Sequence, residues 1–557
     1  MNKKILIYQV FPRWFGNRVE QQQFAGTAEQ NGVGKFNDFT DTALQEIANL
    51  GITHLWYTGV LCHAVPDPFP EIVKGRAGSP YAVVDYYDVA ADLAEEADRR
   101  MEEFEALVER THLSGLKVVI DFVPNHVARN YKSLQKPADV RDLGEDDDPA
   151  QAFSITNDFY YLQDELVLPQ NIQTCGGLSD SFKPRYHERP AKATGNDCFS
   201  THPSMNDWYE TVKLNYGIDY RNNNVFYPPL GGGQGWGLWQ KMLDILLFWA
   251  SKKVDGFRCD MAEMVPLEFW NWVIPKVKAQ YPEIIFIAET YSPSTYKDYI
   301  AVGHFDYLYD KVGLYDTLRE VICCGRSTFD ITACWQAVED VCAHMLRFLE
   351  NHDEQRIASR FFAGDPWKAL PAMLVSAAMH QGPVMIYAGQ ETGEPAEGAV
   401  GFSGDDGRTS IFDYVNVPTL QNYLKSKEIM PITEAYRQLL TFVRDSPTLA
   451  TGEFYDLMWA NTGRQGMDRC YAFLRHTPEE QLLIVAWFGT GSGDTAAINL
   501  HIPPHALNTM GLASNCSYQL TPMFHAEKEI IMNVENEFII NFTNFTYEIY
   551  RFSKKIM

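Results

Sequence analysis

The sequence predicts an α/β protein built on a (β/α)8 TIM barrel, with a subdomain inserted after the third strand and a C-terminal all-β sandwich domain. Three observations support this fold. Eight short apolar runs recur over residues 1–445, and most are followed by a helical pattern. This rhythm stops after the third run, for a stretch too long to be a connecting loop. Beyond residue 445, alternating strand and turn patterns replace the helices.

The first three strands are predicted at 5–11, 52–59 and 116–123. A helix over 38–50 connects the first two, and Gly51 follows it in the position favoured for a C-terminal cap. A second helix, over 95–113, carries apolar residues on one face and charges on the other, as expected of a helix packed outside a sheet. The third run, LKVVIDFV, is apolar almost throughout, which is typical of a parallel strand buried on both faces.

The predicted insertion covers residues 124–235, where Asn, Asp, Gly, Pro and Tyr replace the periodic pattern. The barrel therefore comprises 1–123 and 236–445, and the C-terminal domain comprises 446–557. An open doubly wound sheet is the rival fold, but the first βα turn has no GxGxxG and the chain has no GxxxxGK[ST]. The remaining five strands are predicted at 254–260, 283–289, 305–310, 345–353 and 382–389.

The charge composition limits the kinds of molecule that the protein is expected to bind. The 557 residues include 47 basic and 72 acidic side chains, a net charge of −25. Such a charge repels phosphate backbones and anionic membranes, so no nucleic acid and no membrane partner is expected. A neutral oligosaccharide substrate is compatible with this negative charge. The ten scattered cysteines without ligand spacing, together with the lack of a signal peptide or a long apolar segment, predict a cytoplasmic protein.

Polar residues follow several of the predicted strands. The third strand ends in Asp121 and leads to His126, the fourth ends in Arg258 and Asp260, and the fifth ends in Glu289. The seventh ends in Asn351-His352-Asp353. Each residue alone is most simply a turn or helix-cap residue. Besides Asp121, they together place three carboxylates, two histidines and an arginine at the carboxyl ends of the strands, where the active sites of such barrels lie.

Three carboxylates and one arginine suit glycoside hydrolysis. One carboxylate attacks the anomeric carbon and a second carboxyl group protonates the leaving oxygen. Arg258 lies two residues before Asp260, on the same face of the strand, and should keep that aspartate ionised. Glu289 follows the apolar run IIFIA, a setting that favours the protonated form required of a general acid.

Four segments resemble, in order and spacing, the signature segments of the α-amylase family of retaining α-glucoside hydrolases and transglycosylases. A fifth, SPYAVVDYY from Ser79, resembles a family segment whose tyrosine is a platform for the sugar. The resemblance extends from about Tyr8 to about Tyr414, and the C-terminal β-domain also fits. The four segments are DFVPNH at 121–126, GFRCD at 256–260, AE at 288–289 and NHD at 351–353.

This resemblance implies Asp260 as nucleophile, Glu289 as general acid/base and Asp353 as stabiliser of the transition state. It also implies four residues that contact the sugar or orient the carboxylates. These are Tyr81, His126, Arg258 and His352. The implied reaction is a double displacement through a glycosyl-enzyme intermediate.

Calcium-binding members of the family take ligands from positions that correspond here to Asn125, Lys213 and Met264. Of the three, only Asn125 keeps the residue of the family, and a lysine cation disfavours a bound metal ion. We therefore expect no calcium at this site and no other cofactor. Two further departures from the family pattern are Glu263, where endo-acting members commonly carry lysine, and Gly78, where exo-acting glucosidases carry aspartate. Gly78 argues against a closed pocket for one glucose unit.

The sequence thus predicts a hydrolase that cleaves α-1,4-glucosidic bonds of maltooligosaccharides derived from starch or glycogen. A transglycosylase, such as a 4-α-glucanotransferase, would use the same intermediate, and the sequence leaves this alternative open. A non-catalytic carbohydrate-binding protein is a third possibility, disfavoured because all three carboxylates are present.

Overall fold

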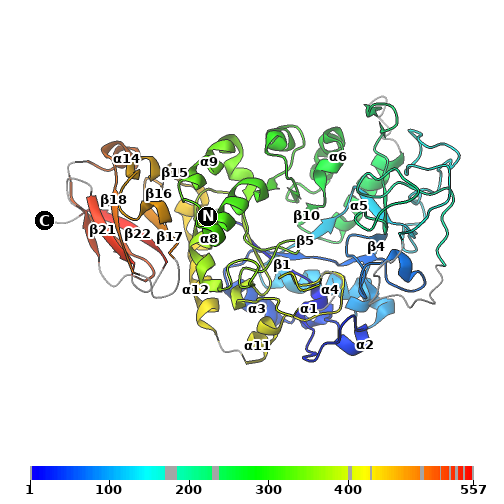
Figure 1. The fold of residues 1–557 in the computed structure, drawn as a ribbon, viewed down its shortest axis with the longest axis horizontal. Coiled ribbons are helices and arrows are strands. Elements are labelled where there is room, and N and C mark those ends of the chain that lie inside the picture. The colour runs from blue at the N-terminus through cyan, green and yellow to red at the C-terminus, as the bar shows by residue number, and fades with distance from the viewer. Residues whose placement is uncertain are drawn as a thin grey trace.

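The computed structural model describes residues 3–169, 185–228, 237–398, 404–426, 429–489, 495–514, 516–525, 529–532, 537–542 and 546–554. Its centre is a barrel of eight parallel strands, in the order β13-β12-β11-β10-β5-β2-β1-β14 (Figure 1). A parallel bridge between Arg347 and Val384 joins the two outer strands. The strands are β1 (Leu6–Val10), β2 (His54–Tyr57), β5 (Lys117–Phe122), β10 (Gly256–Cys259), β11 (Ile285–Ala288), β12 (Tyr307–Tyr309), β13 (Met345–Leu346) and β14 (Val384–Tyr387).

All eight predicted barrel strands are therefore present, and the predicted fold class is confirmed. Burial explains why these runs form strands. Every residue of β1, β2, β10 and β14 is buried, and β5 exposes only Lys117 at its start. Parallel strands buried on both faces need apolar side chains at nearly every position. Among the polar exceptions, Gln9, Asp121 and Arg258 lie toward the carboxyl ends, whereas His54 and Lys117 begin their strands.

Helices surround the barrel (Figure 1). The hydroxyl of Thr40 caps the first long helix by accepting a hydrogen bond from the Ala43 amide at 3.3 Å. In α4, the buried residues Phe104, Leu107 and Val108 form the apolar face predicted from the sequence. The main helices are α3 (Asp41–Asn49), α4 (Arg100–Leu113), α5 (Gly237–Ser251), α6 (Leu267–Gln280), α7 (Tyr296–Ala301), α8 (Asp316–Cys324), α9 (Asp330–Ala337), α10 (Leu370–Ala378), α11 (Pro418–Ser426) and α12 (Pro431–Asp445).

The predicted insertion follows β5 and contains little regular structure. β6 (His126–Ala128) pairs antiparallel with β7 (Thr211–Lys213), so His126 lies opposite Lys213 in the register. A second small pair joins β8 (Ile218–Asp219) to β9 (Val225–Phe226). Residues 170–184 and 229–236 of the insertion lie outside the described residues.

The C-terminal part is antiparallel β-structure, at the left of Figure 1, as predicted. Six strands form one sheet in the order β15-β16-β17-β22-β19-β20, and β18 pairs with β21. The boundaries at 123, 235 and 445 stay predictions. The strands are β15 (Glu453–Asp456), β16 (Cys470–His476), β17 (Gln481–Trp487), β18 (Ala496–His501), β19 (Tyr518–Pro522), β20 (Ile530–Met532), β21 (Glu537–Phe542) and β22 (Tyr547–Lys554).

Among the helices within the described ranges, none combines the length and the apolar character needed to cross a membrane.

Candidate active site

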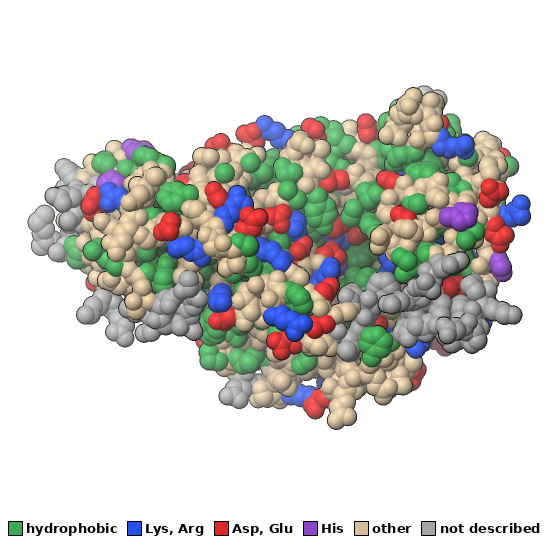
Figure 2. Space-filling model, viewed as in Figure 1, with side chains coloured by type: hydrophobic (Ala, Val, Ile, Leu, Met, Phe, Trp, Pro, Cys, Tyr) green, Lys and Arg blue, Asp and Glu red, His purple; other side chains and the backbone are tan. Residues whose placement is uncertain are grey.

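The predicted site residues converge on one pocket of about 260 Å³ at the carboxyl ends of the barrel strands. Figure 2 shows a recess with acidic side chains near the middle of the molecule, over the region where Figure 1 labels β5 and β10. Six of the seven predicted residues line this pocket. They are Tyr81, His126, Asp260, Glu289, His352 and Asp353. The seventh, Arg258, is fully buried and contacts two of the carboxylates.

Arg258 joins the two central carboxyl groups. Its Nη1 lies 2.7 Å from Asp260 Oδ1, and its Nη2 lies 2.8 Å from Glu289 Oε1. A third carboxylate, that of Asp121, lies 3.5 Å from Nη1. Because β10 and β11 are adjacent and in register, their ends carry Asp260 and Glu289 to neighbouring positions. One guanidinium group thus holds both carboxyl groups that the predicted reaction needs.

Burial, and next the charge of Glu289, raise the pKa of Asp260 well above its ordinary value. Arg258 opposes this rise, as expected from the sequence, but burial outweighs it. Asp260 and Glu289 share this one cation, so the charge of one carboxyl group affects the other. Two carboxyl groups coupled in this way can divide the roles of acid and nucleophile.

Asp353, His352 and Tyr81 form a second connected group that lines the pocket. His352 Nε2 lies 2.7 Å from the Tyr81 hydroxyl and 3.1 Å from Asp353 Oδ2. The rings of Tyr81 and His352 stack with centroids 5.1 Å apart. Burial lowers the pKa of His352 to about 3, so its ring is neutral at ordinary pH. Tyr81 thereby offers a fixed aromatic surface to a sugar ring.

His126 lies on β6, at the base of the insertion. Its ring centroid is 5.2 Å from that of Trp208, which also lines the pocket. Burial lowers the pKa of His126 to about 3. A neutral imidazole can donate one hydrogen bond and accept another, which suits recognition of sugar hydroxyl groups.

The structure adds pocket residues that were not predicted to act there. Lys74 and Glu210 line it as an ion pair with 2.6 Å between Nζ and Oε1. Tyr291 and Met261 both contact Glu289. Only proximity to Glu289 and Asp260 in the sequence could have indicated Tyr291 and Met261. Lys74 and Glu210 follow no strand of the barrel and carried no signal.

The residues at the family's calcium position do not fit a calcium ion. The ammonium group of Lys213 lies 2.8 Å from Asn125 Oδ1 and 2.5 Å from Asp197 Oδ1. A bound cation needs several oxygen ligands and would be repelled by this charge. Within the described ranges, no cluster of three or more His, Cys, Asp or Glu side chains has the arrangement of a metal site.

Gly78 is required by the backbone. Its φ is +76°, and an added Cβ would lie 1.8 Å from the carbonyl oxygen of Ala64. An aspartate therefore cannot occupy this position without a shift of the chain.

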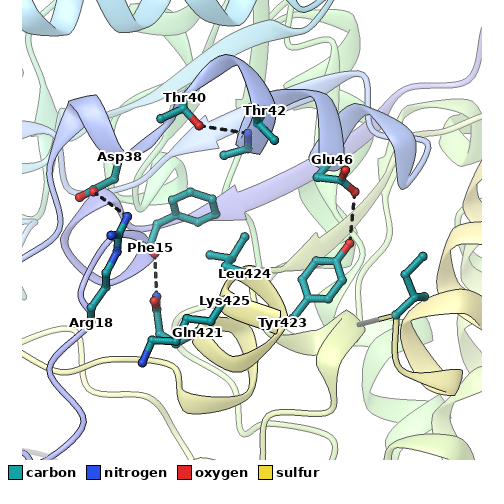
Figure 3. A pocket seen from close by; sticks show the side chains of 13 residues that line it. Phe15, Arg18, Asp38, Thr40, Thr42, Glu46, Gln421, Tyr423, Leu424 and Lys425 are labelled. Carbon is teal, nitrogen blue, oxygen red and sulfur yellow. Dashed lines mark hydrogen bonds and ion pairs between the residues drawn. The ribbon is translucent and has the colours of Figure 1, made fainter. Parts of the chain in front are cut away.

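A second pocket, of about 540 Å³, lies between α3, α11 and the short helix α1 (Pro12–Phe15) (Figure 3). None of the seven predicted residues, all of which the structure describes, lines it. Its charged rim is largely paired, as between Arg18 and Asp38 at 3.8 Å. It therefore lacks the catalytic constellation of the first pocket.

Known proteins are similar to this chain in sequence and in fold. The family model for the alpha-amylase catalytic domain matches residues 9–192 and 237–410. The alpha-amylase MalA of Haloarcula japonica is 24% identical over 496 residues, which cover 86% of this chain and 56% of MalA. This chain thus spans little more than half of MalA. The trehalose-6-phosphate hydrolase of Bacillus subtilis is 22% identical, with 76% of this chain and 69% of the hydrolase covered.

Solved structures agree in fold. The maltogenic alpha-amylase AmyB of Thermotoga neapolitana superposes with a TM-score of 0.63 at 20% identity, and 99% of each chain is covered. The alpha-amylase of Geobacillus thermoleovorans in complex with acarbose gives 0.60 at 17% identity, again with 99% of each chain covered. Since the family model matches most of the barrel and part of the insertion, this chain belongs to the alpha-amylase family of glycoside hydrolases.

Proposed function

We propose that this protein is a retaining α-glucan hydrolase that cleaves α-1,4 bonds of maltooligosaccharides by double displacement. One observation carries the proposal, namely the bridge from Arg258 to both Asp260 and Glu289. It gives a nucleophile and an acid/base group a common, buried counter-charge. The acidic surface and neutral histidines suit an uncharged substrate.

In the first step, the Asp260 carboxylate attacks the anomeric carbon while protonated Glu289 transfers its proton to the glycosidic oxygen. The carbon–oxygen bond to the leaving sugar breaks, and a glycosyl ester forms on Asp260. In the second step, Glu289, now a carboxylate, takes a proton from water as the water oxygen attacks the same carbon. Asp260 leaves as a carboxylate and the product retains its α configuration. Asp353 stabilises the positive charge that develops on the ring.

The substrate is held by residues on both sides of the bond. In this proposal Tyr81 stacks against the ring to be transferred, and His126 and His352 bind its hydroxyl groups. Gly78 leaves the pocket without the aspartate expected of a one-glucose site. Eight described cysteines, leaving Cys516 aside, are free thiols, which supports a cytoplasmic location.

A proton NMR time course with maltoheptaose tests the proposal. The first-formed reducing ends should be α anomers, and Asp260→Asn and Glu289→Gln should each lose at least about a thousandfold in kcat. Full activity of either variant would refute the assignment. Reducing ends that first appear as β anomers would refute the retaining mechanism.

Transglycosylation is the second candidate. The Cereibacter sphaeroides protein named alpha-1,4-glucan:maltose-1-phosphate maltosyltransferase is 31% identical over 129 residues, 22% of each chain. A sugar hydroxyl would then replace water in the second step. Products longer than maltoheptaose in the same experiment would support this candidate.

A further inference from the structure

Glu263 connects the loop after β10 to the loop after β11. It lies three residues beyond Asp260 and is not among the described residues that line the pocket. Its carboxylate accepts hydrogen bonds from the backbone amides of Tyr291, at 2.9 Å, and Ser292, at 3.0 Å. It also accepts one from the Thr295 hydroxyl at 3.1 Å. Glu263 therefore fixes the backbone that presents Tyr291.

Tyr291 in turn contacts the acid/base group. Its hydroxyl donates to Glu289 Oε1 at 2.7 Å. The Met261 amide donates to Glu289 Oε2 at 2.6 Å, and Met261 adopts a left-handed conformation, with φ 44° and ψ 46°. Such a conformation is unfavourable for a residue with a side chain, so the surrounding contacts must maintain it. With the ion pair from Arg258, three groups hold the Glu289 carboxylate.

These three groups differ in one chemical respect. The Met261 amide and the Arg258 guanidinium can only donate hydrogen bonds, whereas a tyrosine hydroxyl can donate or accept. Burial, and then the charge of Glu289, raise the pKa of Tyr291, so the hydroxyl keeps its proton. Tyr291 can donate to Glu289 when it is a carboxylate and accept from it when it is a carboxylic acid.

We propose that Tyr291 and Glu263 are positioning residues that hold the Glu289 carboxyl group in place through both steps of the reaction. Tyr291 acts on Glu289 directly, and Glu263 acts through the backbone of Tyr291. This inference rests on the proposed function, since it requires Glu289 to be the acid/base group.

Other charges also face Glu289, and they set the background for any pH effect. They come from four other barrel strands and from its own loop. These groups are Asp121 on β5, Arg258 on β10 with Asp260 directly after it, Tyr309 on β12, His352 after β13 with Asp353 beside it in the same pocket, and Tyr291 itself. None of them is altered by the substitutions below except Tyr291.

Tyr291→Phe tests the direct contact. Loss of a donor to the carboxylate favours the protonated form, so the basic limb of kcat/KM for maltoheptaose should move up by about one pH unit. With an aryl maltotrioside that carries a nitrophenolate leaving group, the second step limits turnover. There kcat should fall about tenfold, because the Glu289 carboxylate is no longer held in position to take the proton from water, and KM should fall with it as the intermediate accumulates.

Glu263→Gln tests the indirect contact. A glutamine retains one acceptor oxygen but cannot accept from both amides, so the same limb should move in the same direction by a smaller amount. The double variant should shift no further than Tyr291→Phe alone, because both changes act on one contact. Thermal unfolding of each variant confirms folding.

Tyr315→Phe is the matched control, since its hydroxyl donates to Glu354, at 2.9 Å, rather than to Glu289. It should leave the basic limb unchanged. An unchanged limb in Tyr291→Phe, or equal shifts in Tyr291→Phe and Tyr315→Phe, would overturn the inference. Wild-type enzyme and Glu289→Gln are assayed in the same series. Inactive wild type or active Glu289→Gln would instead overturn the proposed function.

Discussion

Lys213 places its ammonium group 2.8 Å from Asn125 Oδ1 and 2.5 Å from Asp197 Oδ1, where other members of the family hold calcium. The side chain is 2% exposed, and its Nζ lies 5.5 Å from the ring centroid of Tyr220. The chain thus supplies its own cation to join the end of β5 to the insertion. Lysine at this position connects the same segments that a metal ion would connect.

Replacement of Lys213 by alanine should destabilise the protein, by about 2 kcal/mol, because the buried oxygen atom of Asn125 loses its donor and Asp197 loses its partner. Thermal unfolding measures this. The apparent Tm of the wild type should not change when a chelator is added. Lys192→Ala is the control in the same insertion, since that lysine lies 3.9 Å from Glu188 and should matter less. A wild-type Tm lowered by the chelator would contradict the prediction.

Two substitutions of Tyr81 should separate its ring from its hydroxyl. Tyr81→Phe keeps the stacking surface but loses the 2.7 Å contact to His352, so kcat/KM should fall about tenfold. Tyr81→Ala loses both the ring and the hydroxyl contact, so its kcat/KM should fall at least about a hundredfold. Because His352 has a pKa of about 3, both losses should be constant over the range in which histidine normally titrates, from about pH 5 to pH 8. Equal losses in the two variants would show that the ring contributes nothing.

Asp121 should make stability depend on pH. Burial raises its pKa to about 6, although Arg258 and the Trp56 indole N–H, 3.0 Å from Oδ2, oppose the rise. The folded protein therefore binds a proton at Asp121 that the unfolded chain does not hold between about pH 4 and pH 6. This contribution is complete below the unfolded pKa and is lost as the pH rises through 6.

We therefore compare the free energies of unfolding of the wild type and of Asp121→Asn. The difference, wild type minus variant, should increase by an amount on the order of 1 kcal/mol as the pH falls from 7 to 5. Urea denaturation at both pH values measures the difference. The variant keeps one acceptor oxygen, for either Trp56 or Arg258, and the loss of the other contact is the same at both pH values, so it cancels in the comparison. A constant difference between the two proteins would contradict the raised pKa.

The sequence was sufficient to predict which residues lie at the strand ends, but it was not sufficient to predict the contacts between loops. Asp260, Glu289 and Asp353 each follow an apolar run, and parallel strands bring such ends together in any closed barrel. The pairing of His126 with Lys213 joins residues far apart in a segment without periodicity. Its register depends on tertiary packing, which no local pattern encodes.

The same limit applies to the groups around Glu289. Glu263 was identified from the sequence as a departure from the family, but its partners, Tyr291 and Ser292, lie on a different loop. Arg258 was expected to contact Asp260, two residues away on the same face. Its second contact, with Glu289, follows from the register of β10 with β11, which becomes known only when the strands are placed.

Arg475 should be essential to the junction between the barrel and the C-terminal sheet. It is fully buried on β16, and its guanidinium donates to the carbonyl oxygen of Ala378, on α10, at 2.6 Å. It also donates to three carbonyl oxygens around α13 (Pro447–Thr451). These belong to Thr448 at 3.0 Å, Leu449 at 3.1 Å and Gly452 at 2.8 Å.

Arg475→Met retains much of the volume but removes all four hydrogen bonds, so the free energy of unfolding should fall by about 3 kcal/mol, although Thr448 and Gly452 each keep one other donor. An opposing effect is present, since Arg347 and Lys4 lie near enough to repel the guanidinium. We expect the lost hydrogen bonds to dominate because there are several of them. Calorimetry should show an earlier transition, whereas Arg551→Met, on the exposed pair with Glu480, should change little. A variant as stable as the wild type would mean that relief of repulsion balances the lost bonds.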